Sequence, residues 1–526
     1  MSATTPSEAR LGALLTSPWT LALVVWLAFF WQLGGPPLYD LDEGAFTEAT
    51  REMLATGNWI TPHKDGEPRY DKPVLIYWLQ AASVAALGLS EFALRLPSAI
   101  AATFWLVALW AFVREHLDAF TAGVAALAMA LSLEIGIIGK AAVADAVLNL
   151  FIALAFFDAY RWWSHPRRAV LLRIYLWLGL GFLTKGPVAV FFPFAVTLLY
   201  ALSYGQPGRW LAAVFAPWGW LVFLLVAAPW YVAVYVDTGG AFFESFFLKH
   251  NLGRYGGVIH SHAGFPGYYL VALPLVVLPF TGWLLRLLGL GRALWADPLD
   301  RFLLLWFLVV FVFFSFSSTK LPHYMVYGIT PLFILMARHR AALESRWLAL
   351  LPPLLFLVLL ALLPLLLWPI AGLAERSHEQ AMWDAAAGVL DWPYRLAMLA
   401  ALLVWIGLWR WNGAACWQRL IVLGVVQTLV VSGMLMPRVL DVMQAPVKEA
   451  GQIARSLDLP TVVYRTSMPS FSVYRQAVTP ARPPRPGDLV FLRIDKLQAL
   501  QRQLPQADLA TVYERGPVML VKVGHD

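Results

Sequence analysis

The chain is poor in cysteine and poor in charge. It has a single cysteine, Cys416, among 526 residues. One thiol excludes an intramolecular disulfide and a cysteine-rich metal site. Only 13% of the residues are charged and 60% are hydrophobic, whereas about 25% of the residues of a soluble domain are charged. The composition therefore excludes a soluble protein.

Long apolar runs predict a polytopic helical membrane protein. Runs of about 20 residues, the length of a membrane-spanning helix, recur between positions 17 and 436, and a first count gives fourteen. Arginine-rich connections lie at 161–168, 286–292, 337–340 and 410–413. Such connections face the cytoplasm, which requires one crossing fewer before residue 144. The weakest run, 73–90, is short and carries Gln80. We interpret it as a helix along the outer surface, which leaves about thirteen transmembrane helices.

This topology brings several connections together on the outer side of the membrane. They are 35–91, 139–144, 237–265, 317–323 and the tail that follows Met436. The expected fold class is an all-α polytopic membrane domain over residues 1–436, with its first outer loop at 35–91. The same topology places the tail outside.

Residues 437–526 differ in character and predict a small α/β domain. Segment 448–457 has helical periodicity. Short strands are predicted at 461–464, 471–474, 489–494 and 518–523. We therefore place a domain boundary between residues 436 and 437.

The first outer loop has more ionisable side chains than a connection between membrane helices needs. Asp42 and Glu43 lie near its start, directly before an apolar-periodic segment. One interpretation is helix capping, since the helix dipole favours acids in the first turn. The other is a carboxylate at the membrane surface that positions or deprotonates an acceptor nucleophile. The two interpretations are compatible.

Lysines followed closely by proline recur at the predicted outer membrane edge. They are Lys72 in segment 70–73, Lys185 in segment 183–187 and Lys320 in segment 317–324. One such lysine is typical of a snorkelling side chain. Several of them on the side where positive charge is disfavoured indicate an anionic partner, such as a phosphate.

The remaining candidates lie in the outer loop 237–265 and at a helix end. His250 and Arg254 belong to a glycine-rich segment with two further histidines. A metal site is one interpretation of this segment, and hydrogen bonding or phosphate contact is the other. Asp145 is a carboxylate at the outer end of a membrane helix, which is either a functional group or a helix N-cap.

Taken together, these motifs resemble a known family. The matching elements are Asp42-Glu43, 70–78, 95–98, Asp145, 181–187, 250–255 and 317–324, in the family's order. The chain is similar to the bacterial GT-C glycosyltransferases that use a polyprenyl-phosphate sugar donor. That family includes the lipid A aminoarabinose transferases and, more distantly, the protein O-mannosyltransferases.

The resemblance implies a GT-C fold in a bacterial inner membrane, with the active site and the C-terminal domain in the periplasm. It implies an inverting transfer of one sugar from a polyprenyl phosphate to a periplasmic acceptor, foremost a glycolipid of the lipid A or lipopolysaccharide type. Transfer to protein or to another surface polysaccharide is the alternative within the class. A transporter or flippase of lipid-linked sugars, or a scaffold for envelope assembly, is the alternative outside it.

The resemblance also implies roles for individual residues. The catalytic carboxylates would be Asp42, Asp145 and Glu43. The ligands of the donor phosphate and lipid would be Lys72, Lys185, Arg254, Lys320, Tyr324 and Tyr70. No cofactor is certain, and a divalent metal (zinc, magnesium or manganese) would be held by Asp71 and His250.

Two departures from the family pattern concern these roles. Asp71 stands where the family often has glutamate. Gly44, Ala45 and Phe46 follow the acidic pair, where the family often has an arginine. The second departure leaves the acceptor open.

Overall fold

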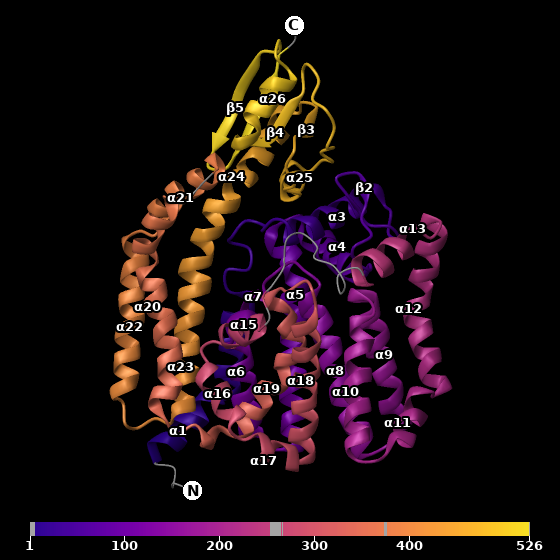
Figure 1. Cartoon of the computed structure of the whole chain (residues 1–526), viewed down its shortest axis with the longest axis vertical. Helices are drawn as coiled ribbons and strands as arrows, with labels where there is room; N and C mark the ends of the chain where they lie inside the picture. Colours follow the sequence, from indigo (N-terminus) through magenta and orange to yellow (C-terminus); the bar gives the residue numbers. More distant parts are fainter. Residues whose placement is uncertain (1–5, 253–264, 266, 373–375, 525–526) are drawn as a thin grey trace.

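The computed structural model describes residues 6–252, 265, 267–372 and 376–524. Its larger part is a bundle of helices, and a small sheet domain stands on one end of that bundle (Figure 1). The elements η1, η2 and η5 are π-helical, and η3, η4 and η6 are 3-10 helices.

The helices of the bundle follow one another with short connections. Its first half contains α1 (Pro6–Leu15), α2 (Pro18–Val25), η1 (Trp26–Phe30), α5 (Glu91–His116), α6 (Ala119–Ala130), α7 (Leu133–Ile138), α8 (Asp145–Ser164), α9 (Arg168–Lys185), α10 (Val188–Ser203), α11 (Pro207–Val214), α12 (Pro217–Thr238), α13 (Ala241–Phe243) and η2 (Glu244–Leu252). Its second half contains α15 (Tyr268–Val276), α16 (Thr281–Leu288), α17 (Gly291–Ala296), α18 (Pro298–Phe316), η3 (Pro322–Met325), α19 (Val326–Arg338), η4 (Arg340–Ala342), α20 (Arg346–Ala371), α21 (Ser377–Val389), α22 (Trp392–Arg410), α23 (Cys416–Val430) and η5 (Val431–Leu435).

The all-α membrane class is confirmed, whereas the expected number of crossings stays a prediction. Among the described residues, six helices are long and apolar enough to span a membrane, or seven if the bent pair Glu8–Leu15 and Pro18–Phe30 forms one span. Some predicted runs are divided into shorter helices. One apolar run is divided into α11 and α12 before Pro217, and another into α15 and α16 before Thr281. Proline in a helix removes a backbone hydrogen bond and clashes with the preceding turn, which favours such breaks.

The first outer loop folds into two helices at the end of the bundle that faces the sheet domain. These are α3 (Asp42–Thr56) and α4 (Leu75–Leu87), with the short hairpin β1 (His63–Lys64) and β2 (Glu67–Pro68) between them. Gly57, at φ 71°, ends α3 in the left-handed conformation that glycine adopts without strain. The helix α4 corresponds to the weak run 73–90 and has 13 residues, which is shorter than a bilayer span.

The C-terminal α/β domain is present, with one helix where a strand was predicted. It contains α24 (Met436–Leu457), β3 (Thr461–Val463), α25 (Ser470–Arg475), β4 (Leu489–Arg493), η6 (Ile494–Lys496), α26 (Leu497–Gln503), β5 (Leu509–Arg515) and β6 (Val518–Val523). The strand order is β3-β4-β6-β5, with β3 and β4 parallel and the other pairs antiparallel. The strand predicted at 471–474 is therefore wrong, because that segment forms α25.

The segments predicted to be outer and inner lie at opposite ends of the molecule. The loop helices α3 and α4, α13 and the C-terminal domain are at one end, and α1, α11 and α17 are at the other (Figure 1). At this second end, Arg209 Nη2 donates to the carbonyl of Trp163 at 2.6 Å, and Arg338 pairs with Asp297 at 2.7 Å. The basic connections thus gather at a single end of the bundle.

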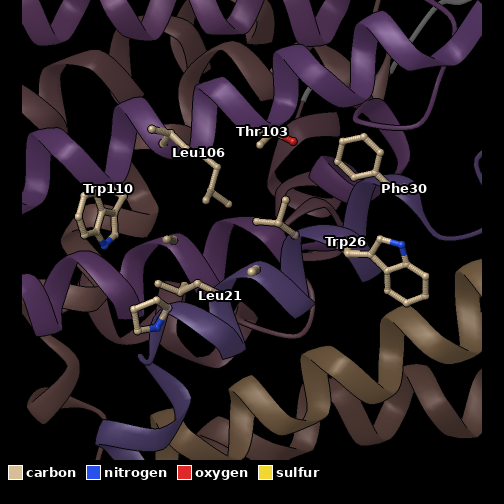
Figure 2. A pocket seen from close by; sticks show the side chains of 11 residues that line it. Leu21, Trp26, Phe30, Thr103, Leu106 and Trp110 are labelled. Atoms are coloured by element: carbon tan, nitrogen blue, oxygen red, sulfur yellow. The ribbon is translucent and has the colours of Figure 1, made fainter.

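An apolar pocket of about 520 Å³ lies among α2, η1, α5 and α6. Figure 2 shows its lining, which includes Leu21, Trp26, Phe30, Thr103, Leu106 and Trp110. It contains no ionisable side chain. The charged groups that could carry chemistry therefore lie outside this pocket.

Candidate active site

Asp42 is the first residue of α3 and is exposed to solvent. The N-cap position belongs to Leu41, which makes no side-chain capping bond. Asp42 is thus not the cap itself, although its charge in the first turn suits the helix dipole. No hydrogen bond joins its carboxylate to the residues that the structure describes. Asp42 therefore presents a carboxylate that is open to a ligand.

Glu43, the next residue, points inward and pairs with Arg95 of α5. Arg95 Nε donates to Glu43 Oε1 at 2.8 Å, and Arg95 Nη2 donates to Oε2 at 2.7 Å. The backbone N–H groups of Ala142 and Tyr39 donate to the same carboxylate at 2.7 and 2.9 Å. Burial raises the pKa of Glu43, but the charge and hydrogen bonds of Arg95 outweigh burial and hold this pKa below its ordinary value.

The pair between Glu43 and Arg95 ties the loop to the bundle. The guanidinium of Arg95 also donates to the carbonyls of Leu33, Pro36 and Pro37, at 3.1, 2.7 and 2.8 Å. Both partners are almost fully buried. This geometry suits Glu43 to hold the start of α3 in place, and it leaves the adjacent Asp42 as the accessible acid.

Asp145 and Lys185 are brought into direct contact. Lys185 Nζ, at the end of α9, lies 2.7 Å from Asp145 Oδ1, at the start of α8. The hydroxyl of Tyr327 in α19 lies 2.8 Å from the same oxygen and 2.7 Å from Lys185 Nζ. All three groups are largely buried, which restricts the side-chain conformations open to them. Tyr327 is a site residue that the motifs did not indicate.

His323 lies where the charged residues of the site meet. The charges that act on its imidazole come from Asp145, Lys185, Asp42 and Lys72. Burial lowers the pKa of His323, the carboxylate of Asp145 raises it, and Lys185 lowers it again, with a net shift below the usual value. The charges of four residues that are far apart in the sequence thus act on this one imidazole, and His323 itself was missed as a candidate.

The Tyr-Asp-Lys-Pro segment places its lysine next to α4. Lys72 Nζ donates to the backbone carbonyl of Asp71 at 3.1 Å. Asp71 Oδ2 lies 3.8 Å from Arg69 Nε. The ring of Tyr70 meets Phe242 edge-on, with centroids 6.0 Å apart. Lys72 is partly exposed beside the N-terminus of α4.

Arg69 is a third residue that the sequence motifs did not indicate. Its guanidinium lies over the ring of Phe46, 4.7 Å from the centroid. Its Nε and Nη1 are buried and have no hydrogen-bond partner among the described residues. Phe46 follows Asp42 by one helical turn, so Arg69 lies on the same face of α3 as Asp42. The only signal in the sequence is its place beside Tyr70.

Lys320 and Tyr324 lie in the connection between α18 and α19. Lys320 Nζ donates to the carbonyl of Ser317 at 2.7 Å. Tyr324 is buried and stacks on Phe314, with ring centroids 4.8 Å apart. Lys320 therefore belongs to the same outer connection as His323, whereas Tyr324 contributes packing beside it.

The metal prediction stays untested. Arg254 lies outside the described residues, and so does the side chain of His250. Within the described ranges, no group of three or more histidine, cysteine, aspartate or glutamate side chains could hold a metal ion. Asp71 has the guanidinium of Arg69 as its neighbour rather than another acid.

Comparisons with known proteins point to one kind of enzyme. Residues 71–232 match the family model described as dolichyl-phosphate-mannose-protein mannosyltransferase. The chain is 30% identical over 347 residues to the undecaprenyl phosphate-alpha-4-amino-4-deoxy-L-arabinose arabinosyl transferase 2 of Proteus mirabilis, which covers 63% of this chain and 59% of the relative. The corresponding transferase of Aeromonas salmonicida is 31% identical over 372 residues, 66% of each chain. The match thus spans roughly three fifths to two thirds of the length of these relatives.

The whole fold has a counterpart among solved structures. ArnT from Cupriavidus metallidurans bound to undecaprenyl phosphate superposes with a TM-score of 0.78 at 21% identity, covering 95% of this chain and 97% of that one. Its apo state gives a TM-score of 0.75 at 22% identity, covering 98% of both chains. The likeness extends over the helical bundle and the C-terminal domain alike.

Proposed function

This chain belongs to the GT-C glycosyltransferases, and from that membership we propose that it transfers a sugar from a polyprenyl-phosphate carrier to a periplasmic acceptor. Undecaprenyl phosphate is the proposed carrier, since the similar transferases are named for it. The proposed acceptor is a glycolipid of the lipid A type. The proposed location is the bacterial inner membrane, with the site and the C-terminal domain on the periplasmic side.

The observation that carries this proposal is the convergence of acids and lysines at one end of the bundle. Asp42, Lys72, Asp145 and Lys185 all act on His323. A glycosyl transfer from a lipid phosphate develops negative charge on the leaving phosphate. Preorganised cations stabilise such charge. Lys72 is suited to the phosphate because its ammonium is partly exposed beside the N-terminus of α4.

Lys185 would serve the same phosphate from the opposite side of the site. Asp145 and Tyr327 hold its ammonium at 2.7 Å each, which fixes its position. Asp145 is therefore assigned a positioning part in the reaction. Asp42 is assigned the acceptor side: it would orient an acceptor phosphate, or deprotonate an acceptor hydroxyl.

A second candidate acceptor is a protein. The family model that matches residues 71–232 is described as a protein mannosyltransferase, which favours this alternative. A transporter of lipid-linked sugars expects charges at the membrane midplane. The charges assigned here lie instead at helix ends and in outer loops.

The proposal can be tested with the purified full chain in lipid nanodiscs, supplied with undecaprenyl-phosphate sugars and either lipid A or a peptide acceptor. We expect Asp42→Asn and Lys72→Ala each to lower kcat by about 100- to 1000-fold, because each removes a group that contacts the reacting centre. Glu67→Gln and Lys522→Ala, two exposed changes away from the site, serve as matched controls. Full transfer by both Asp42→Asn and Lys72→Ala would overturn the proposal. Transfer to the peptide but not to lipid A would show that the acceptor is a protein rather than a glycolipid.

A further inference from the structure

The C-terminal domain contacts the first outer loop through α25. The backbone N–H of Ser470, the first residue of α25, donates to Asp40 Oδ1 at 3.0 Å, and the Ser470 hydroxyl donates to Asp40 Oδ2. Ser470 is fully buried. Burial raises the pKa of the Asp40 carboxyl to about 7, while the hydrogen bonds from Ser470 lower it. Asp40 is thus enclosed between the two domains.

Further contacts fasten the loop on both sides of Asp40. The backbone N–H of Leu38 donates to the hydroxyl of Tyr474 at 2.7 Å. This hydroxyl donates to Glu91 Oε1 at 3.1 Å, and Lys448 Nζ of α24 donates to the same oxygen at 2.6 Å. The loop is therefore held by side chains of α24 and α25 together.

Two more observations indicate a close fit. The hydroxyl of Ser472 donates to Asp65 Oδ1, in the β1–β2 turn, at 2.6 Å. A Cβ atom at Gly44 would lie 2.7 Å from the backbone nitrogen of Ser470 and would also collide with the Asp40 carboxylate. The first turn of α3 and the start of α25 are thus in backbone contact, two residues from Asp42.

We propose that the C-terminal domain positions Asp42, with Asp40 and Ser470 as the positioning residues that fix the first turn of α3. Asp42 has no hydrogen bond of its own to the described residues, so its place depends on the backbone that carries it. The kinetic part of this inference rests on the transfer reaction proposed above, whereas its structural part does not. A displacement of about 1 Å at a reacting group can cost 100-fold in rate.

The structural part is tested by backbone hydrogen exchange of the full chain in nanodiscs, which needs no substrate. We expect Asp40→Ala and Ser470→Ala to speed exchange in segment 38–47 by about tenfold. Asp40→Ala removes both hydrogen bonds from Ser470, and Ser470→Ala removes the one from its hydroxyl. Asp40→Asn keeps the shape and an acceptor for the Ser470 N–H, so it should exchange like the native chain. Ser456→Ala is the matched control, since the Ser456 hydroxyl donates to the carbonyl of Ile453 in its own helix.

The kinetic part uses the same variants with the sugar donor and acceptor. Asp40→Ala, Ser470→Ala and Gly44→Ala should lower kcat by roughly 10- to 100-fold. Because Lys72 and Lys185 are the proposed ligands of the donor phosphate, the KM for the donor should stay within about twofold. Asp40→Asn and Ser456→Ala should keep native kcat. A purely structural role would instead lower the amount of folded protein and leave kcat per folded molecule intact.

The outcomes separate this inference from the proposed reaction. Unchanged exchange in segment 38–47 for Asp40→Ala, Ser470→Ala and Gly44→Ala overturns the positioning inference, whatever the activity. Faster exchange with native kcat also overturns it and leaves the transfer reaction standing. If the native chain transfers no sugar, the proposed reaction fails, and the exchange measurement still decides whether α25 orders the loop.

Discussion

At the scale of single residues, Asp145 and Lys185 show how two separate sequence motifs come together in one ion pair. Consecutive helices joined by a short connection run antiparallel. The first residue of α8 and the last residue of α9 therefore come to the same end of the bundle, where they pair at 2.7 Å. Tyr327 joins them from 182 positions away in the sequence. Nothing in the local sequence marks that tyrosine as a partner.

The role of Tyr327 leads to a prediction for the variant Tyr327→Phe. This change removes one hydrogen bond to a charged carboxylate and one to a charged lysine, and bonds to charged groups contribute about 1.5–3 kcal/mol each. We expect kcat/KM for sugar transfer to fall roughly tenfold or more, since Lys185 loses part of its orientation. Transfer rates measured with a labelled donor would check this. Tyr394→Phe, which also removes one buried hydroxyl bond but in α22, should leave kcat/KM unchanged.

A native rate of sugar transfer for Tyr327→Phe would contradict the proposal that Asp145 and Tyr327 position Lys185. The thermal unfolding midpoints of both tyrosine variants should fall, because each loses buried hydrogen bonding. The comparison therefore separates the local effect on the reaction from the general effect on stability.

At the scale of elements, the helix α3 is the part of the molecule that the surrounding elements hold in place. Arg95 of α5 holds its first turn from the bundle side, through Glu43. Ser470 of α25 holds the residues before it from the opposite side, through Asp40. Neither pairing follows from a local pattern, because each joins residues that are distant in the sequence.

The element α25 also explains why a strand was predicted wrongly at 471–474. Phe471 and Val473 are buried and Tyr474 is partly exposed, and such a short apolar run suits a strand as well as a helical turn. In the folded chain, Phe471 stacks on Phe491 of β4 at 4.0 Å. The N-terminal N–H of this helix is the group that binds Asp40. Contacts with both domains therefore decide the conformation of the segment.

The pair between Glu43 and Arg95 leads to a prediction about stability. Glu43→Gln leaves a buried guanidinium without its charged partner, which costs about 3–5 kcal/mol in comparable buried pairs. We expect a clear fall in the thermal unfolding midpoint of the nanodisc-embedded chain. Glu115→Gln is the control, since Glu115 pairs with Arg161 at a site where half of its side chain is exposed, and such pairs contribute about 0–1 kcal/mol. Equal midpoints for the two variants would contradict the anchoring role of Glu43.

At the scale of the whole molecule, the arrangement of charge predicts how the chain sits in the membrane. The loop helices and the C-terminal domain occupy one end of the bundle, and the basic connections occupy the other (Figure 1). Basic connections remain in the cytoplasm. The end that carries Asp42 and the C-terminal domain should therefore face the periplasm.

Cysteine labelling in spheroplasts tests this orientation. The native Cys416 is buried, so the native chain gives a low background with a membrane-impermeant thiol reagent. We expect Gln506→Cys, on the exposed surface of the C-terminal domain, to react in intact spheroplasts. Ala341→Cys, exposed near the basic connection 337–340, should react only after the membrane is opened. Labelling of Ala341→Cys in intact spheroplasts would reverse the orientation.

The sequence by itself determined the class of the protein and indicated several of the groups near the candidate site. Composition and apolar runs are sufficient for a helical membrane protein, because the bilayer requires long apolar helices wherever the chain crosses it. The prediction that Lys72, Asp145 and Lys185 lie at one end of the bundle followed from helix order and the location of the arginines. The change of character after residue 436 indicated the C-terminal domain, and three of its four strands were predicted.

The tertiary structure alone decided how these groups are paired. The packing of α3 on α5 decides whether Glu43 faces Arg95 or the reacting groups. It also decides whether Asp42 is the accessible carboxylate of the two adjacent acids. The contacts of Tyr327, His323 and Arg69 likewise depend on packing between distant segments. Side-chain periodicity states which face of an element is apolar, but it does not state which partner meets a buried polar group.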